Sequence, residues 1–273
     1  MQGASSVLAN LTVRSYHPGM TTNPIDPRRI EELHLLFTAP REQVVYDGWL
    51  VRRAPNDVKR ARSVNAFYAS TKPVQEKIDH CERLYAEAGL PSLFRLTPFS
   101  RPESLDAALA ERGYERIETD FEQVAHLNRP LPAPPEGVTF HPMLLEDWLE
   151  LAAPIRGQSE AMREAEFRRL HHGEVPGYCL LARVGDEAVA CGLVMQEQEF
   201  ATLMDINVAP PWRRQGLGTA ISAQLLTTAR RNGAEIAWLS VLADNIPAIR
   251  TYAKLGFETL YEYWYRVKEA PLL

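Results

Sequence analysis

The sequence of 273 residues has only three cysteines, Cys81, Cys179 and Cys191, which are widely spaced and form no CxxC pair. Such cysteines argue against a disulfide scaffold or a zinc site and fit a reducing compartment. Long apolar runs are missing, because the longest spans residues 188–195, whereas a membrane-spanning helix needs roughly 20 residues. The N-terminus shows no basic start followed by an apolar core, so it does not resemble a secretory signal. We expect a cytoplasmic protein without a metal site and without a membrane partner.

A basic surplus is absent as well. The chain carries 30 Lys and Arg against 35 Asp and Glu, a formal net charge of −5, and neither side of residue 130 has a basic excess. We therefore expect no nucleic-acid partner. The 45% hydrophobic and 24% charged content is that of an ordinary globular protein, and the length suits one large domain or two of usual size.

Prolines mark the clearest boundary along the chain. Residues 127–137 contain Pro130, Pro132, Pro134 and Pro135, and this density prevents a regular helix or central strand and favours an extended spacer. The sequence thus predicts a loose leader at 1–25, a first domain at 26–126, a linker at 127–137 and a second domain at 138–273.

The second domain alternates between strand-like and helix-like patterns. Apolar residues recur every four positions from Leu217 to Ala229, as on one face of a helix, and residues 236–242 form an apolar run typical of a covered strand. We predict a mixed α/β sheet with flanking helices. The expected strands are 138–141, 178–184, 188–196, 200–208, 236–242 and 257–267, and the expected helices are 146–152, 159–170, 216–232 and 248–255.

The first domain repeats part of this pattern. A shift of 143 residues places Gly113 on Gly256, and a shift of 144 places Gly89 on Gly233. One residue of slack reconciles the two shifts, so we interpret the chain as a tandem duplication of one fold. The pattern predicts strands at 48–53, 63–69 and 93–97 and helices at 74–88 and 104–112.

The most informative segment is the arginine- and glycine-bearing loop between a strand and a helix. Arg213, Gly216 and Gly218 follow a strand that ends at Val208. Glycines let a pyrophosphate approach the backbone, and the free N–H groups of the first helical turn point at its oxygens. The alternatives are a plain glycine-rich turn with solvated arginines, and a dinucleotide loop. The second is disfavoured because no acidic residue ends a following strand about 20 residues on.

Residues 208–218 read V-x-P-x-x-R-x-x-G-x-G, and residues 241–257 read V-x-x-x-N-x-x-A-x-x-x-Y-x-K-x-G-F. This pair of motifs resembles the GNAT N-acetyltransferase superfamily over roughly residues 137–268, and the duplication is similar to tandem GNAT proteins. The resemblance implies a mixed sheet in which acetyl-CoA, the co-substrate, lies between two splayed parallel strands. It implies that backbone groups of Ile206, Asn207 and Val208 contact the thioester and that Asn245 contacts the CoA arm. The implied phosphate-loop contacts come from Arg213, Arg214, Gln215, Gly216, Leu217, Gly218 and Thr219.

Two residues are candidates for proton transfer. Tyr252 stands where the family places its general acid, and a phenol is protonated at neutral pH; its alternative is a half-buried helix tyrosine. The family's glutamate position on the preceding strand is Thr202, which cannot act as a base. Asp205 is the acidic residue on that strand, and it serves as the base, as an anchor for the amine or as a structural hydrogen-bonding group. If a chain of water molecules removes the amine proton, no base is needed. The expected helix at 159–170 carries Glu160, Glu164 and Glu166. These carboxylates either line a pocket for a cationic acceptor or form a solvated face of that helix.

The first repeat lacks the corresponding groups. The shifts place Leu109 at the position of Tyr252, and residues 69–74, ASTKPV, at the phosphate loop without either glycine. We therefore expect a degenerate GNAT-like domain that holds no CoA and packs beside the second domain as a structural partner or as a wall of the acceptor cleft.

The sequence hypothesis is an acetyl-CoA-dependent N-acetyltransferase, an acyltransferase that transfers groups other than amino-acyl groups. A small-molecule or peptide amine attacks the thioester directly, and no metal takes part. Two alternatives stay open: an inactive CoA-binding sensor or regulatory protein, and an acyltransferase that uses a longer acyl-CoA.

Overall fold

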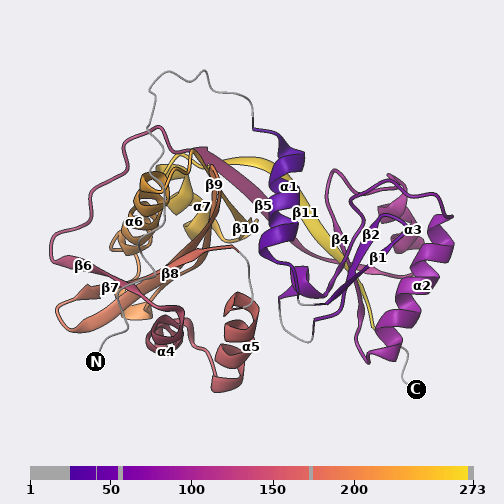
Figure 1. The fold of residues 1–273 in the computed structure, drawn as a ribbon, viewed down its shortest axis with the longest axis horizontal. Coiled ribbons are helices and arrows are strands. Elements are labelled where there is room, and N and C mark those ends of the chain that lie inside the picture. The colour runs from indigo at the N-terminus through magenta and orange to yellow at the C-terminus, as the bar shows by residue number, and fades with distance from the viewer. Residues whose placement is uncertain (1–24, 41, 55–57, 172–174, 270–273) are drawn as a thin grey trace, which may run out of the picture.

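The computed structural model describes residues 25–40, 42–54, 58–171 and 175–269. The predicted leader lies outside the described residues except for Ile25. Eleven strands form one sheet in the order β1-β2-β3-β4-β11-β5-β10-β9-β8-β7-β6. Figure 1 shows α2 and α3 at one end of the molecule and α6 at the other, with the long strands β5 and β11 between them.

The first part of the chain supplies five strands and three α-helices among the described residues. In chain order they are α1 Pro27–Phe37, β1 Gln43–Tyr46, β2 Trp49–Arg52, the 3-10 turn η1 Lys59–Arg62, β3 Val64–Asn65, α2 Val74–Glu87, β4 Ser92–Leu96, α3 Leu105–Glu111 and β5 Glu115–His126.

The second part supplies the remaining elements after the proline-rich segment. They are β6 Val138–Met143, α4 Leu145–Arg156, α5 Glu160–His171, β7 Gly177–Val184, β8 Glu187–Glu197, β9 Phe200–Val208, the 3-10 turn η2 Pro210–Trp212, α6 Leu217–Arg231, β10 Ile236–Leu242, α7 Ile246–Lys254 and β11 Glu258–Lys268.

The two parts exchange their last strands. β5 lies between β10 and β11, and β11 lies between β4 and β5, all in antiparallel pairing. The central pair is symmetric under the predicted repeat: Glu258 pairs with Val124 and Val267 with Glu115, and a shift of 143 residues relates Glu115 to Glu258 and Val124 to Val267. The repeated pattern therefore takes the form of two strand–helix–strand units that share one sheet.

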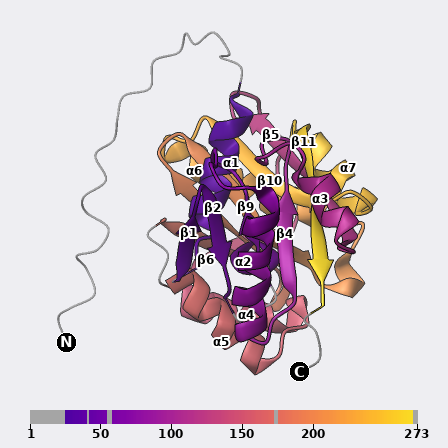
Figure 2. The ribbon, with the colours of Figure 1, turned by 90° about the vertical axis from the view of Figure 1, so that its right-hand side faces the viewer.

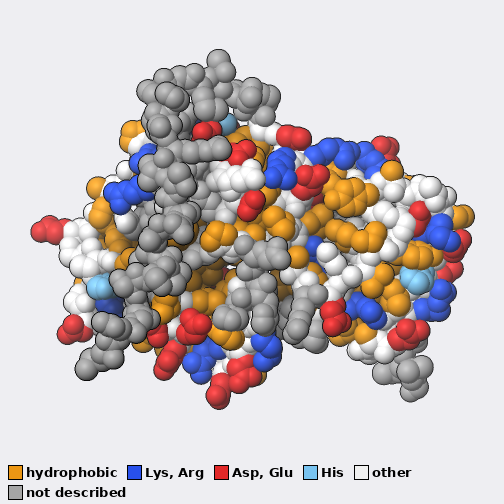
Figure 3. Space-filling model, in the orientation of Figure 1, with side chains coloured by type: hydrophobic (Ala, Val, Ile, Leu, Met, Phe, Trp, Pro, Cys, Tyr) orange, Lys and Arg blue, Asp and Glu red, His pale blue; other side chains and the backbone are white. Residues whose placement is uncertain are grey.

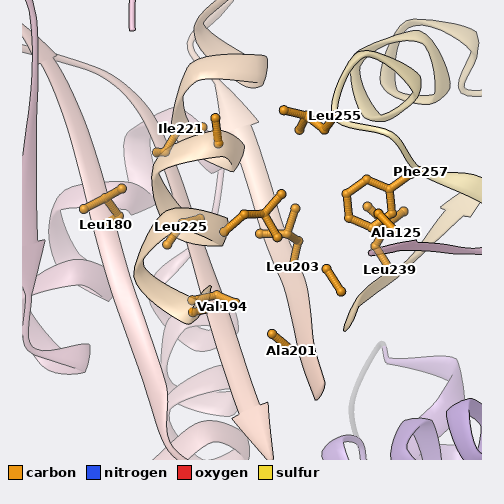
Figure 4. Packing of buried hydrophobic residues seen from close by; sticks show 14 of the residues in the cluster. Ala125, Leu180, Val194, Ala201, Leu203, Ile221, Leu225, Leu239, Leu255 and Phe257 are labelled. Atoms are coloured by element: carbon orange, nitrogen blue, oxygen red, sulfur yellow. The ribbon is translucent and has the colours of Figure 1, made fainter. Parts of the chain in front are cut away.

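Helices cover both faces of the sheet. On one face, α6 and α7 pack over β8, β9 and β10 through an apolar cluster that includes Ile221, Leu225, Leu239 and Phe257 (Figure 4). On the opposite face, α1 and α4 pack over the same strands through a second cluster that includes Trp148 and Trp238. α2 lies over β2 and β4 (Figure 2) through a third cluster.

The predicted fold class, a mixed α/β sheet with flanking helices, is confirmed. The predicted second-part elements are present within a few residues of their expected bounds, and β10 spans the predicted 236–242. The sequence reasoning missed α1, β1 and β5. Among the described residues no helix is long and apolar enough to cross a membrane.

Candidate active site

A bulge interrupts β9 beside a glycine of β8. Cys191 pairs with Asn207 and Leu193 with Met204, so Asp205 and Ile206 together face Gly192. Asp205 has a φ of 54°, and a Cβ at Gly192 would lie 2.5 Å from Ile206 Cδ1. A glycine at this position makes room for the bulge, which bends the strand and re-aims its backbone groups.

β9 and β10 separate just before this bulge. Their parallel pairing runs from Phe200–Ile236 to Thr202–Trp238 and goes no further. Beyond it, β9 continues with β8 as far as Val208 and β10 continues with β5 as far as Leu242. The facing edges of β9 and β10 therefore offer backbone groups to an extended molecule that lies between them.

The predicted phosphate loop leads from β9 into α6. Arg213 Nε donates to the Val208 carbonyl (3.1 Å), Gln215 Nε2 donates to the Pro211 carbonyl (3.3 Å), and Gly216 is the N-cap with a φ of 82°. Arg213, Arg214, Gln215 and Gly216 are exposed, Gly218 and Thr219 are half-buried, and Leu217 is buried in the core beneath the loop.

The N-terminus of α6 differs from the capped N-terminus of α7. The first-turn amides of α6, those of Leu217, Gly218 and Thr219, have no acceptor within the helix, and Gly216 has no side chain that could cap them. In α7, by contrast, Asn245 Oδ1 accepts from the Ala248 amide at 3.2 Å. Uncapped amides and the positive end of the helix dipole are the two features by which a helix terminus attracts an anion.

Asp205 is held by an arginine that the sequence reasoning missed. Arg156, the last residue of α4, lies 3.1 Å from Asp205 and 2.8 Å from Glu166 of α5. The Arg156 and Glu166 side chains are 6% and 8% exposed, and Asp205 is 27% exposed. The ion pair gives Asp205 the structural contact that was one of its predicted roles, and its roles as a base or an amine anchor stay predictions.

Tyr252 lies on α7, where its ring packs edge-on against Phe257 with ring centroids 5.8 Å apart. Burial and the nearby Asp205 carboxylate raise the pKa of Tyr252 to about 12. The phenol therefore stays protonated throughout the neutral range, as a proton donor must.

The glutamates of α5 divide into two groups. Glu160 and Glu164 line a cavity of about 330 Å³ between α4 and α5, on a surface where acidic and basic side chains mix (Figure 3). Glu166 is instead buried against Arg156. Among the described residues no group of three or more His, Cys, Asp or Glu side chains is placed to hold a metal.

Comparisons with known proteins bear on this geometry. Residues 143–257, which contain the bulge, the loop and Tyr252, match the model of the acetyltransferase (GNAT) family. By this match, the second part of the chain contains a domain of the GNAT family. It is 27% identical over 248 residues to an uncharacterized N-acetyltransferase, YobR, of Bacillus subtilis, covering 89% of this chain and 99% of that protein. It is 31% identical over 99 residues to a ribosomal protein bS18-alanine N-acetyltransferase of Escherichia coli, covering 36% of this chain and 58% of that enzyme.

Solved structures extend the likeness to the whole GNAT fold. A GCN5-related N-acetyltransferase from Kribbella flavida superposes with a TM-score of 0.67 at 20% identity, covering 90% of this chain and 96% of that one. A tandem GNAT protein from the clavulanic acid biosynthesis pathway superposes with a TM-score of 0.62 at 16% identity, covering 77% and 76%. The tandem arrangement inferred from the sequence is thus a known form of the GNAT fold.

In the first part of the chain, a carboxylate bonds the segment that the predicted repeat aligns with the phosphate loop. Asp47 accepts hydrogen bonds from the amides of Thr71 (3.0 Å) and Lys72 (2.9 Å), just before α2, the counterpart of α6. The hydrogen bonds that the Lys72 and Thr71 amides donate hold the pKa of Asp47 well below its usual range, although desolvation of the carboxylate opposes them. Pro73 then takes the N-cap position. Two amides of the segment just before α2 are therefore already paired within the chain.

Proposed function

We propose that the chain is an acetyl-CoA-dependent N-acetyltransferase with one working site, located in the second part of the chain. The observation that carries the proposal is the uncapped N-terminus of α6, which stands at the mouth of the opening between β9 and β10. A pyrophosphate bound there directs an attached pantetheine arm along the separated strand edges toward the bulge at Asp205 and Ile206.

The bulge supplies the groups that orient the thioester. Backbone N–H groups of Ile206, Asn207 and Val208 lie where the strand bends, and donors aimed at the carbonyl oxygen stabilise the negative charge that develops during attack. The amine nitrogen forms a bond to the carbonyl carbon, and the carbon–sulfur bond then breaks. Tyr252 donates its phenolic proton to the departing thiolate, and solvent returns a proton to the phenolate.

Direct attack fits the chemistry of the nearby cysteines. Cys179 and Cys191 are buried on β7 and β8, and burial raises the pKa of both thiols to about 12. A thiol of that pKa is a poor nucleophile at neutral pH because the thiolate is the reactive form. A covalent acyl-cysteine intermediate is therefore disfavoured.

One site per chain follows from the contrast between the two loops. The α6 loop has two glycines and leaves the first-turn amides of its helix without an intrahelical partner. The segment that the repeat aligns with this loop has no glycine, and its Thr71 and Lys72 amides, just before α2, bond Asp47. For the acceptor we propose an amine of a small molecule or a peptide. The peptide class is suggested by the bacterial relatives named for an alanine of a ribosomal protein.

Calorimetric titration of the full chain with acetyl-CoA tests the cofactor assignment. We expect one site, lost in Gly216→Asp and in Arg213→Glu because both place negative charge beside the phosphates. CoA release is then measured with a panel of polyamines, amino acids and peptides with free N-termini. Two binding sites would contradict the degenerate first repeat, binding without turnover would favour a sensor, and preference for a longer acyl-CoA would change the donor.

A further inference from the structure

A buried polar network joins the two parts of the chain on the sheet face that α1 covers. Glu122 Oε2, on β5, accepts a hydrogen bond from Ser240 Oγ of β10 (2.9 Å) and lies 3.1 Å from His34 Nδ1 of α1. Arg60 Nη1 of η1 donates to Ser240 Oγ at 2.8 Å. Glu122 and His34 are 0% exposed, whereas Ser240 is only half-buried. The serine is thus the exposed end of a path that leads to a buried carboxyl group.

Ser240 lies at the opening where the acyl group is proposed to bind. It stands two residues beyond Trp238, the last residue of β10 that pairs with β9. Side chains alternate along β10: Trp238 packs in the cluster beneath α1, Leu239 packs in the cluster beneath α6, and Ser240 points back to the α1 face. Tyr252 and the phosphate loop belong to the α6 and α7 face, so we place the acceptor amine on the opposite side of the opening, where the Ser240 side chain is half-buried.

Ser240 can pass a proton on without carrying a charge itself. Its hydroxyl donates to Glu122 and accepts from Arg60, which leaves one of its two lone pairs for a substrate N–H. Glu122 Oε1 makes no hydrogen bond to any residue that the structure describes. The carboxyl group therefore has both a donor at the entrance and an unoccupied oxygen.

We propose that Ser240 and Glu122 form the proton relay of the acceptor amine, an assignment that rests on the proposed N-acetyltransferase function. As the nitrogen bonds to the thioester carbon, its proton moves to Ser240 Oγ while the hydroxyl proton moves to the Glu122 carboxylate. The carbon–sulfur bond breaks, and Glu122 later returns its proton to solvent through Ser240. His34 is a positioning residue that holds Glu122 from the other side.

The surroundings of Glu122 give it the basicity that this step requires. Burial raises its pKa to about 8, against the opposing fields of Arg95 and Arg60. A base with a pKa near the working pH is the most effective proton acceptor. The titratable and charged groups that face Glu122 come from six elements: Glu31 and His34 of α1, Arg60 of η1, Arg95 of β4, Asp120 of β5, Ser240 of β10, and Tyr261 and Tyr263 of β11.

His34 enters this balance as a neutral ring. Burial and the nearby Arg95, Arg60 and Arg52 guanidinium groups hold the pKa of His34 well below its usual value. In the tautomer with its proton on Nδ1, the neutral imidazole donates to the carboxylate without adding charge. The ring stacks on Trp238 with centroids 5.3 Å apart.

The test compares Glu122→Gln and Ser240→Ala with the matched control Glu115→Gln, an exposed carboxyl group on the same strand. Rates of CoA release are measured from pH 6 to 10 with a panel amine that the wild type acetylates. We expect both relay variants to lose about 10²–10⁴-fold in kcat/KM while binding acetyl-CoA normally. The wild-type pH–rate profile should change slope near pH 8, and this change should be absent in Glu122→Gln. Ser240→Thr, which keeps a hydroxyl group, should recover the activity that Ser240→Ala loses.

Three outcomes would overturn the relay. The first is that the relay variants keep the wild-type rate, and the second is that the pH–rate profile of Glu122→Gln still changes slope near pH 8. The third is that an infrared titration of the wild type shows no carboxyl signal that titrates near pH 8 and is absent in Glu122→Gln. The infrared titration needs no acceptor and applies even if a variant folds poorly. A wild-type chain that binds no acetyl-CoA overturns the proposed function instead, which separates the two failures.

Discussion

Gly218→Ala separates the two reasons for which a glycine can stand at the start of α6. Gly218 is the second residue of the helix, and a Cβ there would meet Val208 Cγ2 at 3.7 Å and Thr251 Cγ2 at 3.8 Å, both ordinary contact distances. The folded protein therefore has room for the methyl group. If the glycine serves only the packing of the chain, its replacement has little effect on the affinity for acetyl-CoA.

The magnitude follows from helix propensity and from the position of the methyl group. Alanine is favoured over glycine within a helix by about 0.5–1 kcal/mol, and in the first turn we expect about 0.5 kcal/mol, or a rise in Tm of about 1–2 °C. The same methyl group stands on the turn whose amides face the pyrophosphate. We expect acetyl-CoA to bind at least about tenfold more weakly, a loss of about 1.4 kcal/mol.

Thermal unfolding and calorimetric titration of the same preparation measure the two effects together. The control is Gly233→Ala at the far end of α6, where φ is +95° and a Cβ meets nothing within 4 Å. Its left-handed backbone should cost about 1–2 kcal/mol of stability and leave the affinity unchanged. Wild-type affinity in Gly218→Ala, or equal losses of affinity in both variants, would refute pyrophosphate binding at this turn.

Three further predictions concern charged and titratable groups. Arg156→Leu removes a buried positive charge from beside the carboxylates of Asp205 and Glu166, so urea denaturation should show a loss of about 3 kcal/mol; a loss below about 1 kcal/mol would mean that the pairs act as surface pairs do. Tyr252→Phe should lower kcat about 10²-fold without changing the affinity for acetyl-CoA, and an unchanged kcat would refute its role as the acid. Because burial raises the pKa of Tyr252 to about 12, loss of its proton should not reduce the wild-type activity at any pH up to 10. Burial raises the pKa of Glu122 from 4.5 to about 8, so the native state binds more protons than the unfolded state in that window. Its contribution to unfolding free energy falls as pH rises, by up to about 1.4 kcal/mol per pH unit, and Glu122→Gln should remove this slope in denaturation curves.

Local pattern predicted the second part of the fold well because its elements show regular periodicity. The four-residue spacing in α6 and the apolar run of β10 each mark an element whose burial is simple: one face in α6 and both faces in β10. The hydrophobic pattern did not predict β5, because this strand buries the polar side chains of Asp120, Glu122 and Gln123. A strand with buried acids does not look like a core strand until the arginines that face it are known.

The candidate site divides in the same way between local and distant residues. The phosphate loop and Tyr252 are contiguous motifs, so their positions follow from the sequence. Arg156 and Gly192 act on Asp205 and Ile206 from other elements, α4 and β8, and no spacing in the sequence joins them. Asp47 is separated by 24 residues from the amide of Thr71 that it occupies, and only the fold brings the two together.

The first part of the chain, although its own loop is filled, shapes the working opening. β10 pairs with β5 along all of its residues from Ile236 to Leu242, so its backbone groups on that edge are satisfied from the neighbouring repeat. β10 can therefore leave β9 after Trp238 without losing its place in the sheet. The strand that anchors β10 also carries Glu122 to the edge of the opening, under Ser240. The first part of the chain thus supports β10 where it leaves β9 and supplies the carboxyl group that we propose for the acceptor side.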